Sequence, residues 1–216
     1  MKRSSAFGSA MLPLVLVLFH APSWGAQASR PAAAGTTEHA YFGLGCFWSA
    51  ESAYEGIPGV KSVTSGYTGG SEKNPTYEQV SLGTTGHFEA VDVAFDPAKI
   101  SYARLLDTFW HNIDPMQSSG QFCDHGKHYR SAIFYRDSTQ RREALASRRT
   151  LEASGELKSP IVTLILPAGA FWPAEEYHQD FWRRNPDHYG RYRVGCGRDR
   201  RLAQIWGDRA AKPVAH

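Results

Sequence analysis

The chain has 216 residues, of which 42% are hydrophobic and 12% are aromatic, and its formal charge at neutral pH is +3. This composition predicts a globular protein with one substantial core, and it excludes a chain that is disordered throughout. Loss of Lys2 and Arg3 with a cleaved signal lowers the charge to about +1, so we expect no nucleic-acid-binding surface.

The amino terminus has the pattern of a secretory signal. Two basic residues precede the apolar run MLPLVLVLF, and Ala26 and Ala28 supply a small-x-small cleavage site. The run is about half the ~20 residues that a membrane-spanning helix requires, so we expect no stable membrane association after processing; an uncleaved anchor helix is the alternative. We predict a signal peptide over residues 1–28, a disordered leader over 29–39, a single domain over 40–208 and a flexible tail over 209–216. The mature protein is then expected in the periplasm, as a monomer.

Strand and helix patterns alternate along the rest of the chain. Period-two alternation and aromatic or β-branched runs predict strands at 39–45, 60–67, 87–96, 129–135 and 161–166. Helical spacing and cap residues predict helices at 46–57, 101–113, 138–154 and 173–184. This order predicts the α+β class, with a mixed or antiparallel sheet, packed helices and a ferredoxin-like split βαβ core, that is, an α/β sandwich.

The cysteines indicate thiol chemistry. There are three, Cys46, Cys123 and Cys196, so one stays unpaired in an oxidising compartment, and no CxxC motif is present. Cys46 follows Gly43 and Gly45 at the predicted start of a helix, where unpaired N–H groups and the helix dipole favour a thiolate and lower the cysteine pKa. We interpret Cys46 as a nucleophile; a buried structural cysteine is the alternative.

Six motifs in register extend this interpretation. From about residue 41 to 184, the chain contains GCFWSAE, GVKSVTSGYTGG, NPTYEQV, TGHFEAVDVAFDP, YRSAIFY and PAEEYHQDF. Together they resemble the type A peptide methionine sulfoxide reductase family. The resemblance implies reduction of protein-bound and free methionine S-sulfoxide to methionine, in repair of oxidised proteins, without a bound cofactor or metal. The implied electron donor is a thioredoxin-like dithiol.

The resemblance also implies residue roles. Cys46 attacks the sulfoxide sulfur, and Glu89 supplies the proton that allows oxygen to leave. Glu89 stands between apolar Phe88 and Ala90, which places it on the opposite face of the strand from Phe88. Other residues implied to serve the site are Tyr77 and Tyr129, which bind the sulfoxide oxygen, Asp124, which orders water, and Phe47, Trp48 and His178, which line the substrate site.

The sulfenic acid formed at Cys46 requires a resolving cysteine. Cys196 in RVGCGRD is favoured because its glycine neighbours imply a mobile segment, and Cys123 is the alternative. The family more often places this cysteine directly after a tyrosine, and here the sequence YGRYRVGCG departs from that pattern.

Three alternative interpretations, from other classes of protein, are also compatible with the sequence. Cys123, His125 and His128 have the spacing of a zinc half-site, although no second pair of ligands accompanies them. A Cys-His hydrolase could use Cys46 with His87, His111 or His178 as its base. A methionine-binding protein with merely structural cysteines is the third.

Overall fold

The computed structural model describes residues 35–210. The predicted signal peptide, most of the leader and residues 211–216 lie outside this range. The strands are β1 (Glu38–Gly43), β2 (Val60–Thr68), β3 (Phe88–Phe95), β4 (Gly120–Gln121), β5 (Asp124–His125), β6 (Ala132–Tyr135), β7 (Leu164–Pro167) and β8 (Trp172–Pro173). The helices are α1 (Phe47–Tyr54), α2 (Tyr77–Ser81), α3 (Tyr102–His111), α4 (Ser138–Ala153), α5 (Phe181–Arg184), α6 (Pro186–Gly195) and α7 (Arg198–Trp206).

Six strands form one mixed sheet in the order β7-β6-β1-β3-β2-β8. Neighbouring strands are antiparallel except at one edge, where β7 runs parallel to β6. Because β3 lies between β1 and β2, the β1-α1-β2 unit is split, as in ferredoxin-like folds. The predicted α+β class and split βαβ core are therefore confirmed.

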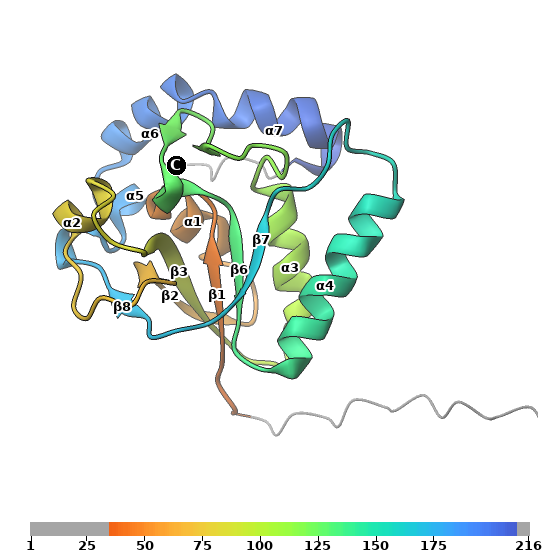
Figure 1. Cartoon of the computed structure of the whole chain (residues 1–216), viewed down its shortest axis with the longest axis horizontal. Helices are drawn as coiled ribbons and strands as arrows, with labels where there is room; N and C mark the ends of the chain where they lie inside the picture. The colour runs from red at the N-terminus through yellow and green to blue at the C-terminus, as the bar shows by residue number, and fades with distance from the viewer. Residues whose placement is uncertain (1–34, 211–216) are drawn as a thin grey trace, which may run out of the picture. The chain divides into compact units, whose positions relative to one another are not determined.

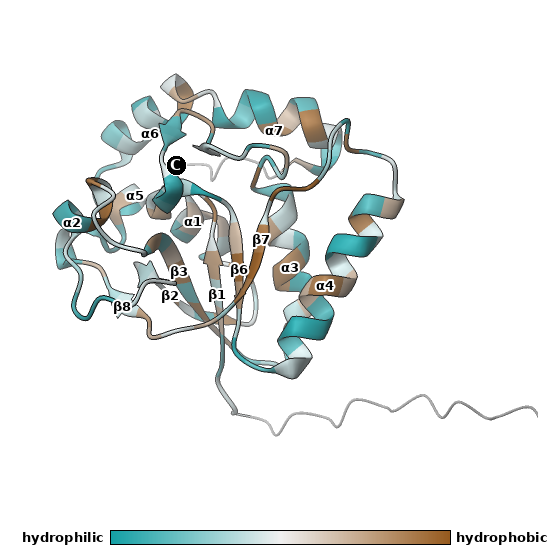
Figure 2. Cartoon of the chain, viewed as in Figure 1, coloured by the Kyte–Doolittle hydropathy of each residue, from teal (hydrophilic) through white to brown (hydrophobic). Residues whose placement is uncertain are grey.

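Each face of the sheet is covered differently. Phe42, Val91 and Ile133 belong to the main core, which they share with residues of α1 and α3 such as Phe47 and Phe109. The opposite face carries a smaller cluster around Phe134, against which Phe88 and Phe171 pack. In Figure 1 the connection from β7 to β8, residues 168–171, crosses in front of β1 and β6. Figure 2 shows β7 mostly hydrophobic and much of α4 and α7 hydrophilic, as expected for a buried sheet beneath surface helices.

The carboxyl-terminal third differs most from the sequence prediction. The predicted helix at 173–184 is a short strand, a 3-10 turn at Glu176–His178 and the four-residue α5. The Gln179 side chain accepts a hydrogen bond from the Ser65 N–H at 3.0 Å and donates to the Ser65 carbonyl at 2.9 Å, which fixes this segment against β2. Asp180 then takes a left-handed φ of +53°, which ends any continuous helix.

Smaller differences have local causes. The predicted leader ends earlier than expected, because Glu38 and His39 already pair with β3 and the His39 ring bonds Asp92 at 2.8 Å. The unpredicted α2 begins with a capping box between Thr76 and Gln79, a T-x-x-Q signal present in the sequence. The predicted tail begins within a helical turn, Gly207–Arg209. Within residues 35–210, no helix combines the length and apolarity needed to cross a membrane.

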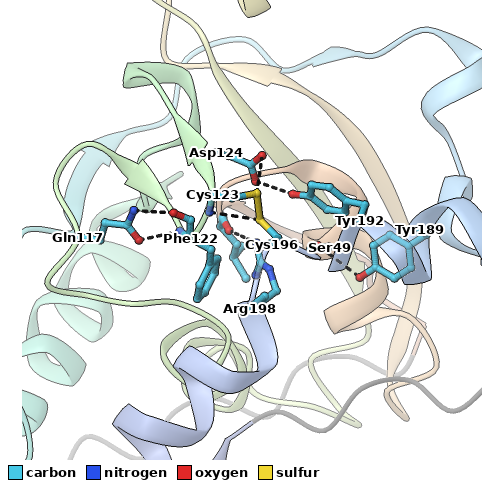
Figure 3. The surroundings of a disulfide bond; sticks show 10 residues. Ser49, Gln117, Phe122, Cys123, Asp124, Tyr189, Tyr192, Cys196 and Arg198 are labelled. Carbon is cyan, nitrogen blue, oxygen red and sulfur yellow. Dashed lines mark hydrogen bonds between the residues drawn. A yellow bond between two sulfur atoms is a disulfide. The ribbon is translucent and has the colours of Figure 1, made fainter. Parts of the chain in front are cut away.

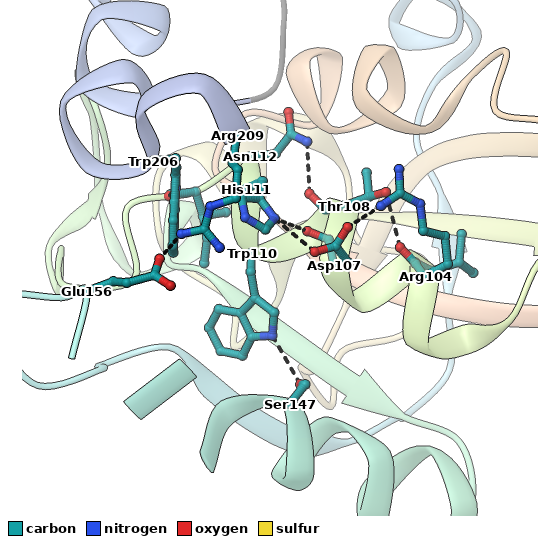
Figure 4. Close-up of polar contacts among 12 residues, drawn as sticks. Arg104, Asp107, Thr108, Trp110, His111, Asn112, Ser147, Glu156, Trp206 and Arg209 are labelled. Carbon is teal, nitrogen blue, oxygen red and sulfur yellow. Dashed lines mark hydrogen bonds and ion pairs between the residues drawn. The ribbon is translucent and has the colours of Figure 1, made fainter. Parts of the chain in front are cut away.

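Helix α7 was not predicted, and it is anchored at both ends. At its start the buried Arg198 donates to the carbonyl oxygens of Asn112 at 3.0 Å and Leu44 at 2.9 Å. At its end the Trp206 indole donates to the Ile113 carbonyl at 3.0 Å, and its ring lies 4.9 Å from that of His111 (Figure 4). These contacts hold the start of α7 close to the residues that precede Cys46.

Candidate active site

Cys46 is the residue immediately before α1 and carries a free thiol that is 7% exposed. Its carbonyl accepts the N–H groups of Ser49 and Ala50, so the chain turns directly from Cys46 into the helix. Gly45 precedes it with φ +87°, and a Cβ at that position would lie 2.7 Å from the Gln121 Cβ. Only glycine fits this turn, which fixes the thiol at the helix start as predicted.

Glu89 lies beside the thiol. Its Oε2 accepts the Phe47 N–H at 3.0 Å, and the residue is 1% exposed. Burial raises the pKa of Glu89 to about 8, and nearby Asp124 adds to that rise, while the hydrogen bonds from Phe47 and Tyr129 oppose it. At neutral pH the carboxyl group therefore holds a proton. Phe88 packs on Phe134 across the sheet, so the strand does place Phe88 and Glu89 on opposite faces.

The expected low pKa of Cys46 is wrong. Burial raises the pKa of the thiol, and the charges of Glu89 and Asp124 raise it further. Hydrogen bonds from Tyr192 and from the Trp48 N–H lower it, but by less. The nearest helix N–H, that of Phe47, is bound to Glu89, so the helix start serves the carboxyl group more than the sulfur.

Tyr77 and Tyr129 also meet at this site. They come from α2 and from the turn before β6, and a hydrogen bond between them lowers the pKa of Tyr77. Burial, with the charge of Glu89 next, raises the pKa of both phenols, so both keep their protons. Glu175 accepts the Tyr77 N–H at 2.8 Å and so fixes the start of α2. Two protonated hydroxyl groups therefore stand beside Glu89, where they can donate to a substrate oxygen.

An aromatic group borders the thiol. Phe47 is buried with its ring 4.8 Å from that of His178, and Trp48 is half-buried and stacked on Phe181 at 3.7 Å. The Trp48 indole donates to His178 Nδ1 at 3.1 Å, and burial lowers the pKa of that histidine. The ring of His178 is also 4.3 Å from the ring of Tyr77. The rings of Phe47, Trp48 and Tyr77 thus meet around His178 in one aromatic cluster, and its role in substrate binding stays a prediction.

Asp124 links the thiol region to the other two cysteines. The Tyr192 hydroxyl donates to Asp124 Oδ2 at 2.5 Å, and the same side chain lies near enough to Cys46 to lower the pKa of its thiol. Burial raises the pKa of Asp124, and the Tyr192 bond opposes the rise. The Cys123 sulfur is 3.7 Å from Asp124 Oδ1. Asp124 and Tyr192 thus lie between Cys46 and Cys123.

Cys123 and Cys196 form a disulfide with an S–S distance of 2.01 Å (Figure 3). The bond joins the favoured resolver, Cys196, to the alternative, Cys123, and which of them attacks Cys46 stays a prediction. Cys196 lies at the junction of α6 and α7, and the predicted mobility of this segment stays a prediction. The Cys123 sulfur is bonded to carbon and to a second sulfur, so the zinc half-site with His125 and His128 is not formed.

The other histidines fit no hydrolase. His87 is held by the Glu72 carbonyl at 2.8 Å and the Gly70 N–H at 3.3 Å, and His111 by the Asp107 carbonyl at 2.8 Å. The hydrogen bonds of these two rings go to backbone groups of their own segments and not to Cys46. His178, the third candidate base, accepts a hydrogen bond from the Trp48 indole at Nδ1.

Known proteins match this site and fold. The sequence model of the peptide methionine sulfoxide reductase family matches residues 38–210. The chain belongs to this family. The reductase is 51% identical over 172 residues to the peptide methionine sulfoxide reductase MsrA of Bacillus velezensis, covering 80% of this chain and 97% of that one. It is 49% identical over 195 residues to MsrA 2 of Caulobacter vibrioides, covering 89% and 98%.

Solved structures agree with this assignment. Methionine sulfoxide reductase A of Corynebacterium diphtheriae is 34% identical with a TM-score of 0.61, over 69% of this chain and 76% of that one. Reduced Mxr1 of Saccharomyces cerevisiae is 29% identical with a TM-score of 0.65, over 69% and 86%. The chain is therefore a methionine sulfoxide reductase, a thiol-dependent oxidoreductase, and neither a hydrolase nor a methionine-binding protein.

Three residues of the reductase site were missed in the sequence. Tyr192 contacts Cys46 and Asp124, Glu175 fixes Tyr77, and Arg198 ties the start of α7 to Leu44. A signal for Tyr192 was present, since it stands four residues before Cys196, one helical turn away. Glu175 and Arg198 act through contacts 98 and 154 residues apart in sequence, which no local pattern shows.

Proposed function

We propose that this reductase acts on the S epimer of methionine sulfoxide, free or within oxidised proteins, with Cys46 as the nucleophile and Glu89 as the proton donor. One observation carries the proposal: a buried carboxyl group with a pKa of about 8 is hydrogen-bonded to the residue next to a free thiol. An unprotonated oxide is a very poor leaving group, so oxygen transfer requires an acid that still holds its proton at neutral pH.

The raised pKa of Cys46 fits the proton balance. In the reaction, the thiol and the sulfoxide become a sulfenic acid and a thioether. The number of protons on the enzyme does not change, because the proton of the Cys46 thiol is replaced by the proton of the sulfenic acid. Glu89 gives its proton to the sulfoxide oxygen while Cys46 loses its thiol proton to the carboxylate that this creates. The Cys46 sulfur bonds the substrate sulfur as the S–O bond weakens. The protonated oxygen then passes to the Cys46 sulfur, and the S–S bond breaks with its electron pair on the methionine sulfur, so a permanent thiolate is not required.

The remaining site residues are proposed to hold the substrate. The Tyr77 and Tyr129 hydroxyls donate to the sulfoxide oxygen and make its sulfur more electrophilic. Phe47 and Trp48 pack against the methyl group of the substrate, and His178 holds the Trp48 indole in place. Asp124, which is bonded to Tyr192, orders the water released when the sulfenic acid is resolved.

Cys196 and Cys123 are proposed to act one after the other. The Cys196 thiol attacks the Cys46 sulfenic acid, which forms a Cys46–Cys196 disulfide and releases water. The Cys123 thiolate then attacks the Cys196 sulfur, which frees Cys46 and gives the Cys123–Cys196 disulfide. The bonded pair and the free Cys46 thiol support this as the end state. A thioredoxin-like dithiol restores the two thiols, and the family needs no prosthetic cofactor.

Three results test this function with the reductase. Turnover with dithiothreitol should convert the S epimer to methionine and leave the R epimer unchanged. One equivalent of S-sulfoxide should reduce the thiol count of the fully reduced enzyme from three to one, with the bond mapped to Cys123–Cys196. In Cys123→Ser the bond should map to Cys46–Cys196 instead. Equal turnover of the epimers, or no thiol loss, would contradict the proposal.

We further infer export to the periplasm as a monomer. The basic start, the apolar run and the small-x-small site support cleavage after residue 28. Amino-terminal sequencing of the protein from the periplasmic fraction of the native host is expected to begin near Ser29. Recovery of an intact amino terminus from the cytoplasmic fraction would refute the export step.

A further inference from the structure

Cys123 lies at the tip of a two-residue hairpin. Strands β4 and β5 pair Gln121 with Asp124, so Phe122 and Cys123 form the turn. Phe122 has a φ of +57°, a region that favours glycine. The Gln117 side chain holds this residue by accepting its N–H at 2.6 Å and donating to its carbonyl at 3.1 Å (Figure 3). The two hydrogen bonds hold this strained turn, and Cys123 at its tip is exposed.

The two sulfurs of the disulfide are not equivalent. Cys123 is exposed and Cys196 is half-buried. The Cys123 N–H donates to Cys196 Sγ at 3.2 Å, and the same N–H can stabilise a thiolate on that sulfur. The end of α6 and the start of α7 meet at Cys196, so their dipoles oppose each other there and the hydrogen bond decides. A donor that attacks Cys123 thus approaches the more exposed residue, and the leaving Cys196 thiolate is stabilised by the hydrogen bond.

Exposed apolar and basic residues stand in the two segments that carry the disulfide cysteines. Val194 is 76% exposed, and a Cβ at Gly195 would meet no atom within 4 Å. Lys127, Arg191 and Arg200 are exposed in the segments that carry the two cysteines. Among residues 35–210 no acidic side chain forms an ion pair with any of these three. We call these five residues the donor surface.

We propose that the reductant attacks Cys123, and that the donor surface receives a thioredoxin-like protein with acidic side chains around its reactive thiol. The proposal rests on the function proposed above. The donor thiolate forms a bond to the Cys123 sulfur, the Cys123–Cys196 bond breaks, and its electron pair leaves on Cys196. The second donor thiol then attacks the mixed disulfide, which releases Cys123 and oxidised donor; two electrons and two protons reach the enzyme. Charge complementarity speeds this encounter.

Trapping shows which sulfur is attacked. The oxidised reductase is mixed with excess bacterial thioredoxin whose second active-site cysteine is replaced by serine, then quenched with acid within a second, alkylated and digested. The expected product joins the donor to the Cys123 peptide, with Cys196 alkylated. A donor bonded mainly to Cys196, or no mixed disulfide while wild-type thioredoxin supports turnover, overturns the proposal.

A matched pair of variants tests the surface. The readout is the ratio of thioredoxin-driven to dithiothreitol-driven turnover, since the small uncharged dithiol has no need of a protein surface. Val194→Glu should lower this ratio at least fivefold, because it removes an apolar contact and places a negative charge opposite the acidic side chains of the donor. Leu82→Glu changes another strongly exposed apolar residue, 70% exposed at the end of α2, and should keep the ratio. Equal ratios in the two variants overturn the surface assignment.

Salt concentration distinguishes docking of the donor from reduction of the sulfoxide. The KM for thioredoxin should rise severalfold between 50 mM and 500 mM salt, because screening weakens contacts between exposed charges. Dithiothreitol-driven reduction of the sulfoxide should continue at both concentrations. Loss of the dithiothreitol reaction in the wild type would instead defeat the proposed function, whatever the donor does.

Discussion

Replacing Cys46 by serine is expected to abolish sulfoxide reduction, with a fall in kcat/KM on the order of 10⁴-fold or more. Serine has nearly the same shape, so the buried position beside α1 is kept. Its oxygen is a much weaker nucleophile toward sulfur and forms no sulfenic acid, so the first step has no substitute. Methionine release from the S-sulfoxide, measured with excess dithiothreitol, gives the rate.

Cys196→Ser is the matched control for this loss. That variant keeps the Cys46 thiol and Glu89, so without added reductant it should still form one methionine for each enzyme before it stops as a sulfenic acid. The Cys46→Ser enzyme should give no such burst, and Cys123 and Cys196 should remain reduced. A serine variant within tenfold of the wild-type rate would leave the mechanism without its nucleophile.

Glu89→Gln is expected to slow the first chemical step by ~10²–10⁴-fold. Glutamine has the same length, and its amide oxygen can still accept the Phe47 N–H, so the fold around α1 should persist. An amide does not transfer a proton to the leaving oxygen. The rate of methionine formation in a single turnover isolates this step from the later disulfide exchange.

The pH profile identifies the proton donor. Because the folded pKa of Glu89 is raised to about 8, the acid is present below that pH and is lost as the pH rises through it. The wild-type single-turnover rate should therefore fall about tenfold per pH unit above about 8, and Glu89→Gln should lack this limb. Glu78→Gln, an exposed carboxylate on α2, should keep it. An unchanged alkaline limb in Glu89→Gln would assign the proton to another group.

The structure also explains why the thiol needs this partner. In a buried site a charged Cys46 and a charged Glu89 repel each other, and burial penalises both charges, so the resting pair is neutral. The substrate oxygen takes the proton from one member as the other begins to bond sulfur. The site therefore avoids an exposed thiolate, which is the form most open to unwanted oxidation.

Local patterns in the sequence determined much of this enzyme. Strand alternation separated Phe88 from Glu89, glycine and cap positions located the helix start at Cys46, and element order predicted the split sheet. These features depend on residues that are neighbours in the chain, where spacing alone sets which side chains share a face. The matched motifs then carried the family and its reaction.

Only the tertiary structure decided how the three cysteines are arranged. The Cys123–Cys196 bond spans 73 residues and depends on α7 docking through Arg198 onto Leu44, which no local spacing encodes. The pKa of Cys46 likewise moved opposite to the helix-start expectation. Desolvation and nearby carboxyl charges are properties of the packed site, and here they outweigh the dipole of one short helix.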